Sequence, residues 1–202
     1  MSKLRLGVLA SGRGSNLQAI IDNIAANKLD AEVAVVISDN PDAFALERAR
    51  NHRIPAVHIK PGDYREKEEY EKAVIDCLRE NRAELVVLAG YMRLVGKVLL
   101  DEYPNRIMNI HPALLPSFPG LHGQRDAVAY GVKYSGCTIH FVDEGMDTGP
   151  IILQEVVPVL QDDDEDSLAA RILKEEHKLY SKAIQLFAEG KLRIEGRKII
   201  II

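Results

Sequence analysis

Short apolar runs alternate with segments of helical periodicity along the first half of the chain. The runs are rich in Val, Ile and Leu, as is typical of parallel strands that are buried on both faces. They occupy residues 4–10, 32–38, 55–59, 85–90 and 106–110. Between them, apolar positions recur at helical spacing in residues 17–24, 43–51 and 70–78. The alternation predicts an α/β fold built on a doubly wound, mostly parallel sheet.

The pattern changes after residue 131. Residues 136–142 and 150–160 have the composition of two strands joined by a turn-rich loop, which predicts an antiparallel edge, and residues 167–188 have the periodicity of a long helix. The acidic run 162–166 lies where negative charge stabilises a helix start, so we expect it to cap and solvate that helix. The apolar residues 198–202 predict either an added strand or an interface, and both readings stay open.

Length and pattern together predict one domain over residues 1–202. Within it we expect an N-terminal half of about residues 1–105, a C-terminal half of about residues 106–190 and a short apolar tail over residues 191–202.

Charge and composition limit the classes of partner. The 26 basic and 30 acidic residues are interspersed and give a net charge of -4, so the sequence predicts no binding of nucleic acid or of an anionic membrane. No apolar stretch reaches membrane-spanning length. Cys77 and Cys137 have neither zinc-site spacing nor the pattern of a disulfide framework. We therefore expect a cytoplasmic protein that acts on small molecules without a metal, and its oligomeric state, monomer or homodimer, stays open.

The strand expected at residues 106–110 leads into the most distinctive motif of the chain. Asn109 and His111 are two positions apart, so their side chains should project from the same face, and Pro112 keeps His111 extended. An amide beside an imidazole can hold a carbonyl oxygen while the imidazole moves a proton, which is what acyl transfer requires. The alternative is a histidine whose hydrogen bonds are merely satisfied at a strand end. No Ser or Cys nucleophile stands beside the pair in the sequence.

A second motif, residues 11–18, lies between the first strand and the first helix. Amides at a helix N-terminus and a glycine-rich backbone bind anions, so a phosphate fits here. The alternative is a plain turn in which Ser15 caps the helix and Gln18 returns the bond, as in a capping box. The two interpretations are compatible.

Further polar positions are candidates for the same chemistry. Asp147, in a glycine-flanked loop, either forms an Asx-type turn or raises the pKa of His111 and supports a proton relay. Glu176 falls on the apolar stripe of the long helix, where a carboxylate is either paired in a salt bridge or functional. His140 either lines the site or hydrogen-bonds within the sheet, and we favour the sheet. For His122 we expect a loop-packing role.

The loop at residues 91–95 offers apolar contacts and exposed backbone to a flat ring, and Arg93 is suited to attract an acidic tail. The alternative is a helix start that packs Met92 and Leu94 inward.

Three separated motifs, S-G-R-G-S-N-L-Q at residues 11–18, N-I-H-P-A-L-L-P at 109–116 and D-E-G-M-D-T-G-P at 143–150, resemble the phosphoribosylglycinamide formyltransferase family of purine synthesis. The resemblance covers about residues 3–190. It implies a Rossmann-like formyltransferase fold and transfer of the formyl group of 10-formyltetrahydrofolate, the co-substrate, to the amine of 5-phosphoribosylglycinamide. Since no nucleophile stands beside Asn109, we expect direct transfer through a tetrahedral intermediate, with the oxyanion held by Asn109 and protonated His111.

The resemblance also assigns roles to individual residues. It assigns catalysis to Asn109, His111 and Asp147, the ribotide to Gly14, Ser15, Asn16 and Glu176, and the folate to Lys67, Met92, Arg93, Leu94, Val95 and Asn109, with Arg65 as the alternative to Lys67. Thr148 stands where some relatives have Gly, which we expect to alter closure of the loop without removing the Asp147 carboxylate.

Rival functions are a formyltetrahydrofolate hydrolase, a methionyl-tRNA formyltransferase and a dinucleotide-binding regulatory module. The hydrolase would need a regulatory domain ahead of Lys3 and the tRNA enzyme a further basic domain, so the length argues against both. Gly12 and Gly14, with Asp39 after the second strand, imitate part of a dinucleotide fingerprint. Leu17, however, stands where its third glycine belongs.

Overall fold

The computed structural model describes residues 3–202 and divides into two compact units, Met1–Met108 and Asn109–Ile202. Met1 and Ser2, which the expected domain includes, lie outside the described residues. The first unit contains β1 (Leu4–Leu9), α1 (Ser15–Ala25), β2 (Ala31–Ser38), α2 (Phe44–Asn51), β3 (Ala56–His58), η1 (Pro61–Asp63), α3 (Lys67–Glu80), β4 (Leu85–Leu88) and α4 (Lys97–Glu102). Strand β5 (Ile107–His111) crosses the boundary, and the second unit continues with α5 (Gly123–Tyr130), β6 (Tyr134–Phe141), β7 (Ile151–Pro158), α6 (Glu165–Ala188), β8 (Leu192–Glu195) and β9 (Lys198–Ile201).

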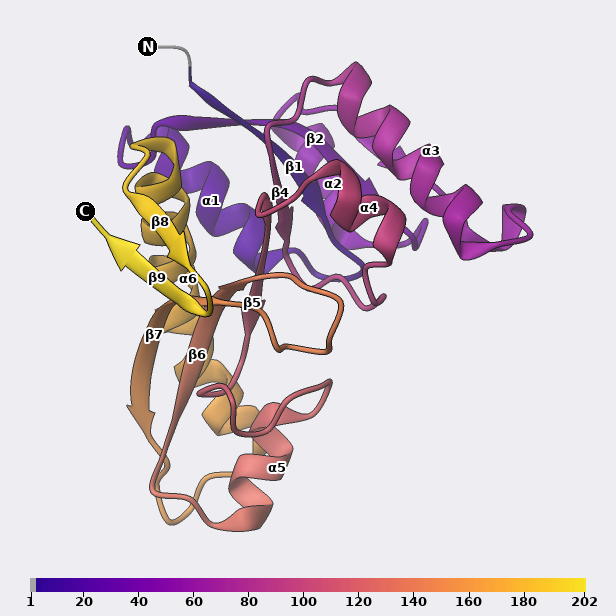
Figure 1. The fold of residues 1–202 in the computed structure, drawn as a ribbon. Helices are drawn as coiled ribbons and strands as arrows, with labels where there is room; N and C mark the ends of the chain where they lie inside the picture. Colours follow the sequence, from indigo (N-terminus) through magenta and orange to yellow (C-terminus); the bar gives the residue numbers. More distant parts are fainter. Residues whose placement is uncertain (1–2) are drawn as a thin grey trace. The chain divides into compact units, whose positions relative to one another are not determined.

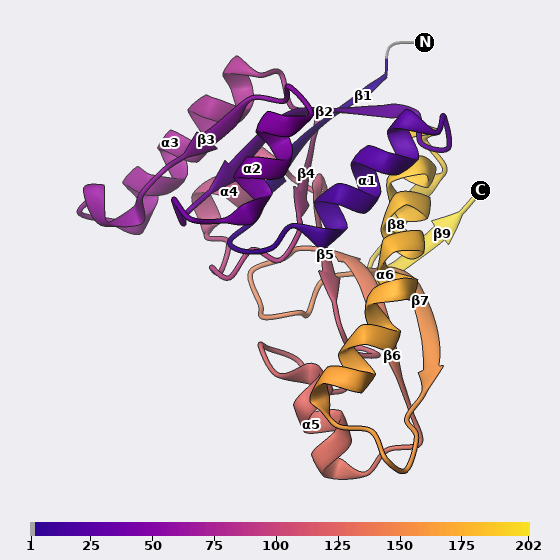
Figure 2. The ribbon, with the colours of Figure 1, turned by 180° about the vertical axis from the view of Figure 1, so that it is seen from behind.

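The first unit is a parallel sheet with helices on both faces. Its strands are ordered β3-β2-β1-β4, the pairs of β1 with β2, β1 with β4 and β2 with β3 are parallel, and β5 follows β4. Helices α1 and α2 cover one face and α3 and α4 the other (Figures 1 and 2). Packing on the α3 side is close, because a Cβ at Gly7 of β1 would lie 2.2 Å from Cδ2 of Leu78. The doubly wound arrangement expected from the alternating pattern is confirmed.

Neighbouring parallel strands place two loops of this unit side by side. Strands β1 and β4 pair through Leu9 and Leu88, so the loops that follow them leave the same edge of the sheet. The backbone N–H of Ser11 donates to the carbonyl of Gly90 over 3.0 Å. Ligands of open α/β sheets bind at this edge, beyond the carboxyl ends of the strands.

The second unit is mostly antiparallel. Strands β6 and β7 pair antiparallel, β8 and β9 form an antiparallel hairpin, and β9 meets β7 in parallel through Ile151 and Lys198. Helix α6 packs on β6 and β7, as Figure 2 shows. The apolar tail is therefore an added strand. The expected α/β class, with an antiparallel edge and a long helix, is confirmed.

The acidic run 162–166 caps α6, as expected. Asp164 is the N-cap residue; its carboxylate accepts from Ser167 N–H over 2.8 Å while the Ser167 hydroxyl accepts from Asp164 N–H over 2.9 Å. The helix consequently begins at Glu165, two residues before the expected start. The short helices α4 and α5 were not expected, because fewer than three turns carry little periodic signal.

Cys77 and Cys137 are free thiols in the structure. Among residues 3–202, none of the helices is long and apolar enough to cross a membrane.

Candidate functional site

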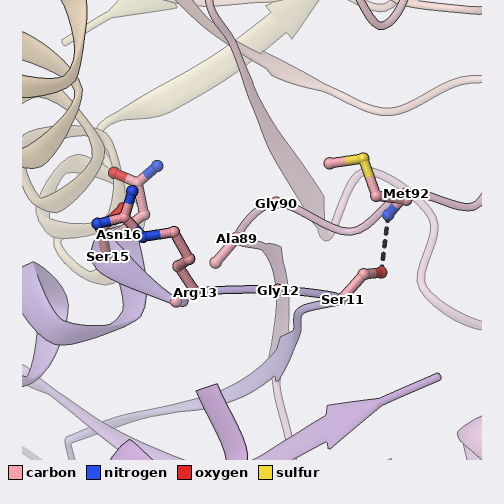
Figure 3. Close-up of a pocket in the computed structure, with 9 residues that line it drawn as sticks. Ser11, Gly12, Arg13, Ser15, Asn16, Ala89, Gly90 and Met92 are labelled. Carbon is pink, nitrogen blue, oxygen red and sulfur yellow. Dashed lines mark hydrogen bonds between the residues drawn. The ribbon is translucent and has the colours of Figure 1, made fainter. Parts of the chain in front are cut away.

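The loop between β1 and α1 forms one wall of a pocket in the first unit. The pocket has a volume of about 240 Å³ and is lined by residues 11–16 with Ala89, Gly90 and Met92 (Figure 3). Gly14 has a φ of 68°, and a Cβ there would lie 2.7 Å from Cβ of Ala45, so only glycine fits without rearrangement. The loop is thus folded tightly at the point where α1 begins.

The alternative in which Ser15 and Gln18 form a capping box is wrong. Gly14 occupies the N-cap position, no side chain caps α1, and Ser15 is its first helical residue. The Gln18 side chain instead donates to Asp22 over 2.8 Å. The N-terminal amides of α1 therefore face the pocket without a capping side chain, which is the condition for anion binding.

The loop after β4 is fastened at its start. The backbone N–H of Met92 donates to the Ser11 hydroxyl over 2.9 Å, which Figure 3 marks, and the hydroxyls of Tyr91 and Tyr70 are 2.8 Å apart. Met92 and Leu94 are 60% and 61% exposed, so the alternative in which they pack inward is wrong. The loop presents apolar side chains on a backbone that is already held in place.

The end of the same loop is fastened by a buried carboxylate. Glu71 of α3 accepts from the backbone N–H of Gly96 and, over 3.3 Å, from that of Leu99. Lys67, one turn earlier on α3, places its ammonium 3.9 Å from Glu71. The Arg93 guanidinium lies over the Tyr70 ring, 5.3 Å from its centroid. Two basic groups thus accompany the loop, and Glu71 orients one of them.

A cluster of four polar side chains occupies the second unit, at the end of β5. The Asp147 carboxylate joins it: Oδ2 is 3.4 Å from Nδ1 of His111, and Oδ1 lies 3.4 Å from the Asn109 amide nitrogen and 3.6 Å from Nε2 of His140. The Asn109 amide also contacts His140 Nε2 at 3.2 Å. Both imidazoles are buried. Asn109 and His111 both approach the Asp147 carboxylate, as strand alternation predicted for side chains on one face.

His140 is a member of this cluster, so our preference for a role confined to the sheet is wrong. Its Nδ1 faces the carbonyl of Phe141 at 2.9 Å and must carry a proton, because a carbonyl can only accept. In the neutral ring Nε2 is then free to accept from Asn109, and it donates to Asp147 only when protonated. The alternation of His140 with Thr138 on β6 was the available signal, since it placed both on one face.

Thr138 holds the loop that follows His111. Its hydroxyl donates to the carbonyl of Ala113 over 2.7 Å and accepts from Leu115 N–H over 3.1 Å. That loop returns the Phe118 carbonyl to within 2.7 Å of His111 Nε2. Backbone groups of this loop, invisible to motif reasoning, therefore complete the surroundings of the imidazole.

Burial lowers the pKa of His111 below its ordinary value, and the opposing effects of the Asp147 carboxylate and the Phe118 carbonyl do not reverse this. The Asp147 carboxylate does raise the pKa of His111, as expected, but the loss of hydration on burial is the larger effect and the net pKa is lowered. The contact with the Phe118 carbonyl assigns the proton of the neutral ring to Nε2. A proton gained at Nδ1 would face the carboxylate directly.

Asp147 remains ionised in this environment. Burial alone would raise the pKa of the Asp147 carboxyl, but the adjacent His140, the Gly120 amide and His111 lower it overall. The amide of Gly120 donates to Oδ2 over 2.8 Å. The cluster thus couples a stable carboxylate to an imidazole that is ordinarily neutral.

The loop around Asp147 contains an Asx-type turn, but Asp143 forms it. Oδ1 of Asp143 accepts from the N–H of Gly145 over 3.1 Å and from the Thr148 hydroxyl over 2.6 Å. Asp147 itself has a φ of 55°, in the left-handed region, and directs its carboxylate to the cluster. The turn-forming alternative for Asp147 is excluded, and Thr148 takes part in closing the loop.

The two remaining candidates differ in burial. Glu176 of α6 is 7% exposed, in agreement with its position on the apolar stripe. His122 precedes α5 and is exposed, so the expected packing role is wrong. Within residues 3–202, no three His, Cys, Asp or Glu side chains are grouped in a way that would hold a metal ion.

Comparison with known proteins agrees with these features. The Formyl transferase family matches residues 4–184. The chain is 44% identical over 181 residues to the phosphoribosylglycinamide formyltransferase of Bacillus subtilis, covering 90% of this chain and 93% of that protein. It is 46% identical over 188 residues to the trifunctional purine biosynthetic protein adenosine-3 of Drosophila melanogaster, covering 92% of this chain but only 14% of that longer protein.

Among solved structures, glycinamide ribonucleotide transformylase 1 from Symbiobacterium toebii superposes with a TM-score of 0.98 at 52% identity, covering 100% of this chain and 95% of that one. The family match extends over most of the chain, and the fold agrees along its whole length. The chain therefore belongs to the formyl transferase family.

Proposed function

We propose that the chain is a phosphoribosylglycinamide formyltransferase of purine biosynthesis. In this role it transfers the formyl group of 10-formyltetrahydrofolate to the amine of 5-phosphoribosylglycinamide, in the cytoplasm, as a monomer or homodimer. Residues 1–202 act as one formyltransferase domain. The observation that carries the proposal is the cluster of Asn109, His111 and Asp147, in which a carboxylate orients an imidazole beside an amide.

The cluster supports direct transfer. The amine nitrogen of the ribotide bonds to the formyl carbon, and the carbonyl oxygen gains the electron pair and becomes an oxyanion. The Asn109 amide and a proton on His111 stabilise that oxyanion, since donors placed where charge develops lower the barrier. Although burial lowers the pKa of His111, the developing negative charge favours the protonated ring, and Asp147 stabilises the resulting imidazolium.

Collapse of the tetrahedral intermediate breaks the bond between the formyl carbon and the folate nitrogen. The attacking amine loses a proton and the departing nitrogen gains one, so the net transfer needs no external acid or base. His111 passes this proton through Nε2, which exchanges its contact with the Phe118 carbonyl for the substrate while Nδ1 stays on Asp147. Asp147 assists by fixing the ring and by remaining anionic.

The ribotide phosphate binds at the N-terminus of α1. Gly14, Ser15 and Asn16 line the pocket there, and the uncapped amides and positive helix end favour an anion. Glu176 binds the ribose, since a carboxylate accepts hydrogen bonds from vicinal hydroxyls.

The folate ring binds against Met92, Arg93, Leu94 and Val95. The exposed apolar side chains of Met92 and Leu94 and the tethered backbone suit a flat heterocycle. Asn109 contributes a polar contact to the same co-substrate. Lys67 is the basic residue for its acidic tail, because Glu71 holds the Lys67 ammonium in place, and Arg65 is the alternative.

The test is to mix the protein with a 10-formyl folate and follow the deformylated folate spectrophotometrically, with and without the ribotide. Turnover that requires the ribotide supports the transferase. Turnover without it would instead identify a formyltetrahydrofolate hydrolase. Silence in both mixtures, with NAD binding in a calorimeter, would replace the proposal with a dinucleotide-binding module.

A further inference from the structure

The hairpin of β8 and β9 is not used by any step above, and it follows the residues matched by the family, 4–184. Its turn nevertheless contacts the loop that contains Asp147. The Arg197 guanidinium donates to the carbonyl of Thr148 over 2.7 Å. Thr148 is the residue that follows Asp147, so the hairpin reaches the backbone of the proposed catalytic loop.

The position of this contact is set by strand pairing. Lys198, the first residue of β9, pairs with Ile151, the first residue of β7. The hairpin is closed at its other end by Ile202 N–H donating to the Lys191 carbonyl over 3.1 Å. Arg197 is therefore held opposite the segment that leads from the loop into β7.

The loop needs such support, because Asp147 adopts a left-handed φ that costs about 1 kcal/mol or more in a residue with a Cβ. A strained conformation persists only when its surroundings fix it. Thr148 is fixed on two sides, by its hydroxyl on Asp143 and by its carbonyl on Arg197. Next to it, Gly149 is buried so closely that a Cβ would lie 1.7 Å from the Phe141 carbonyl oxygen.

We propose that Arg197 is a positioning residue: by binding the Thr148 carbonyl it holds the Asp147 carboxylate against His111. The catalytic significance of this role depends on the proposed function, whereas the role in positioning the carboxylate does not. When the contact is lost, the loop relaxes and the carboxylate withdraws from the imidazole.

The test compares Arg197→Met, which keeps the aliphatic stem and removes the donor, with Arg193→Met. Arg193 lies in the same hairpin and pairs only locally, with Glu195 at 2.8 Å, among the contacts described. For Arg197→Met we expect kcat to fall about five-fold, as one exposed charged hydrogen bond allows, with the KM of both substrates unchanged. Arg193→Met should match the wild type, and Arg197→Lys, which keeps a donor, should recover part of the loss.

A second readout does not depend on activity. The groups facing the His111 ring are Asp147 from the loop, His140 from β6 and the Phe118 carbonyl. Since the Asp147 carboxylate favours the protonated ring, Arg197→Met should move the titration of His111, followed by NMR, to lower pH. The pH above which kcat falls should shift in the same direction.

The proposal is overturned if Arg197→Met and Arg193→Met give the same kcat and the same His111 titration, even when Arg197→Met lowers the melting temperature. That combination would leave only a structural role. Failure of the proposed function appears differently: wild-type protein would not transfer the formyl group, while the NMR titration would still report whether Arg197 positions Asp147.

Discussion

Replacing Asp147 by Asn tests the charge of the proposed catalytic cluster while preserving its shape. Asn is isosteric, tolerates the left-handed φ of 55° better than most residues, and keeps an oxygen for the Gly120 amide. The change removes the negative charge beside the His111 ring, and it replaces the oxygen that faces Asn109 and His140 with an amide nitrogen.

The size of the effect follows from the separation of the charges. Opposite unit charges at the observed 3.4 Å between Nδ1 of His111 and Oδ2 of Asp147 attract by about 5 kcal/mol at an effective dielectric constant of about 20. The Asn dipole restores part of this, so we expect a loss of about 3 to 4 kcal/mol in transition-state stabilisation, or about 100- to 1,000-fold in kcat.

The assay is formyl transfer with both substrates saturating, measured across pH. In Asp147→Asn, kcat should fall by the stated factor. The pH above which kcat declines should also move down, because the carboxylate that raises the pKa of His111 against the effect of burial is gone. The role given to Asp147 would be refuted if Asp147→Asn kept kcat within about three-fold of the wild type and left the pH profile unchanged. A loss of about three-fold is well below the loss of rate expected on removing a proton-transfer group.

Three further predictions concern the proposed oxyanion donor, the packing around Gly14 and the stability of the protein at acid pH. Asn109→Ala should lower kcat about 100- to 1,000-fold as the loss of one oxyanion donor does, and near-full activity would remove Asn109 from the mechanism. In denaturant unfolding, Gly14→Ala should destabilise the fold by at least about 1 kcal/mol more than Gly131→Ala. Both glycines have a positive φ, but only Gly14 lies against Ala45. Equal losses of stability would contradict the packing argument. The pKa of Asp147 is lowered in the folded protein, so its contribution to stability is complete above the unfolded pKa and is lost as pH falls through the lower folded pKa. The wild type should therefore lose more free energy of unfolding than Asp147→Asn between about pH 5 and pH 3. Parallel plots of unfolding free energy against pH for the two proteins would contradict the shift.

Local pattern predicted the longer elements of the first unit because each of them repeats its own period, whereas the short helix α4 was missed. Buried strands such as β2 are continuous apolar runs, and α3 repeats its apolar face over 14 residues. Turn chemistry was less predictable. The S-N-L-Q segment satisfies the capping-box pattern, yet Gly14 supplies the N-cap because its φ of 68° and its contact with Ala45 determine where α1 begins.

For the candidate site, alternation along β5 correctly paired Asn109 with His111, since strand geometry alone sets which side chains share a face. His140 was misjudged because its partners lie on β5 and in the loop near residue 147, and register between strands is not visible in one segment. The pKa of His111 depends on burial, which is a property of the packed structure.

The amino-acid sequence by itself determined the order and type of the main elements, the positions of the glycine-rich loop and of the Asn109 and His111 motif, and membership of a family. These are local properties, set by periodicity, backbone freedom and residue chemistry. Only the tertiary structure decided that His140 joins the cluster, that the pKa of His111 is lowered and that Arg197 donates to the Thr148 carbonyl. Each of these depends on hydration lost in packing or on distances between segments remote in sequence, because the free energy of a buried charge or hydrogen bond is set by all the groups around it.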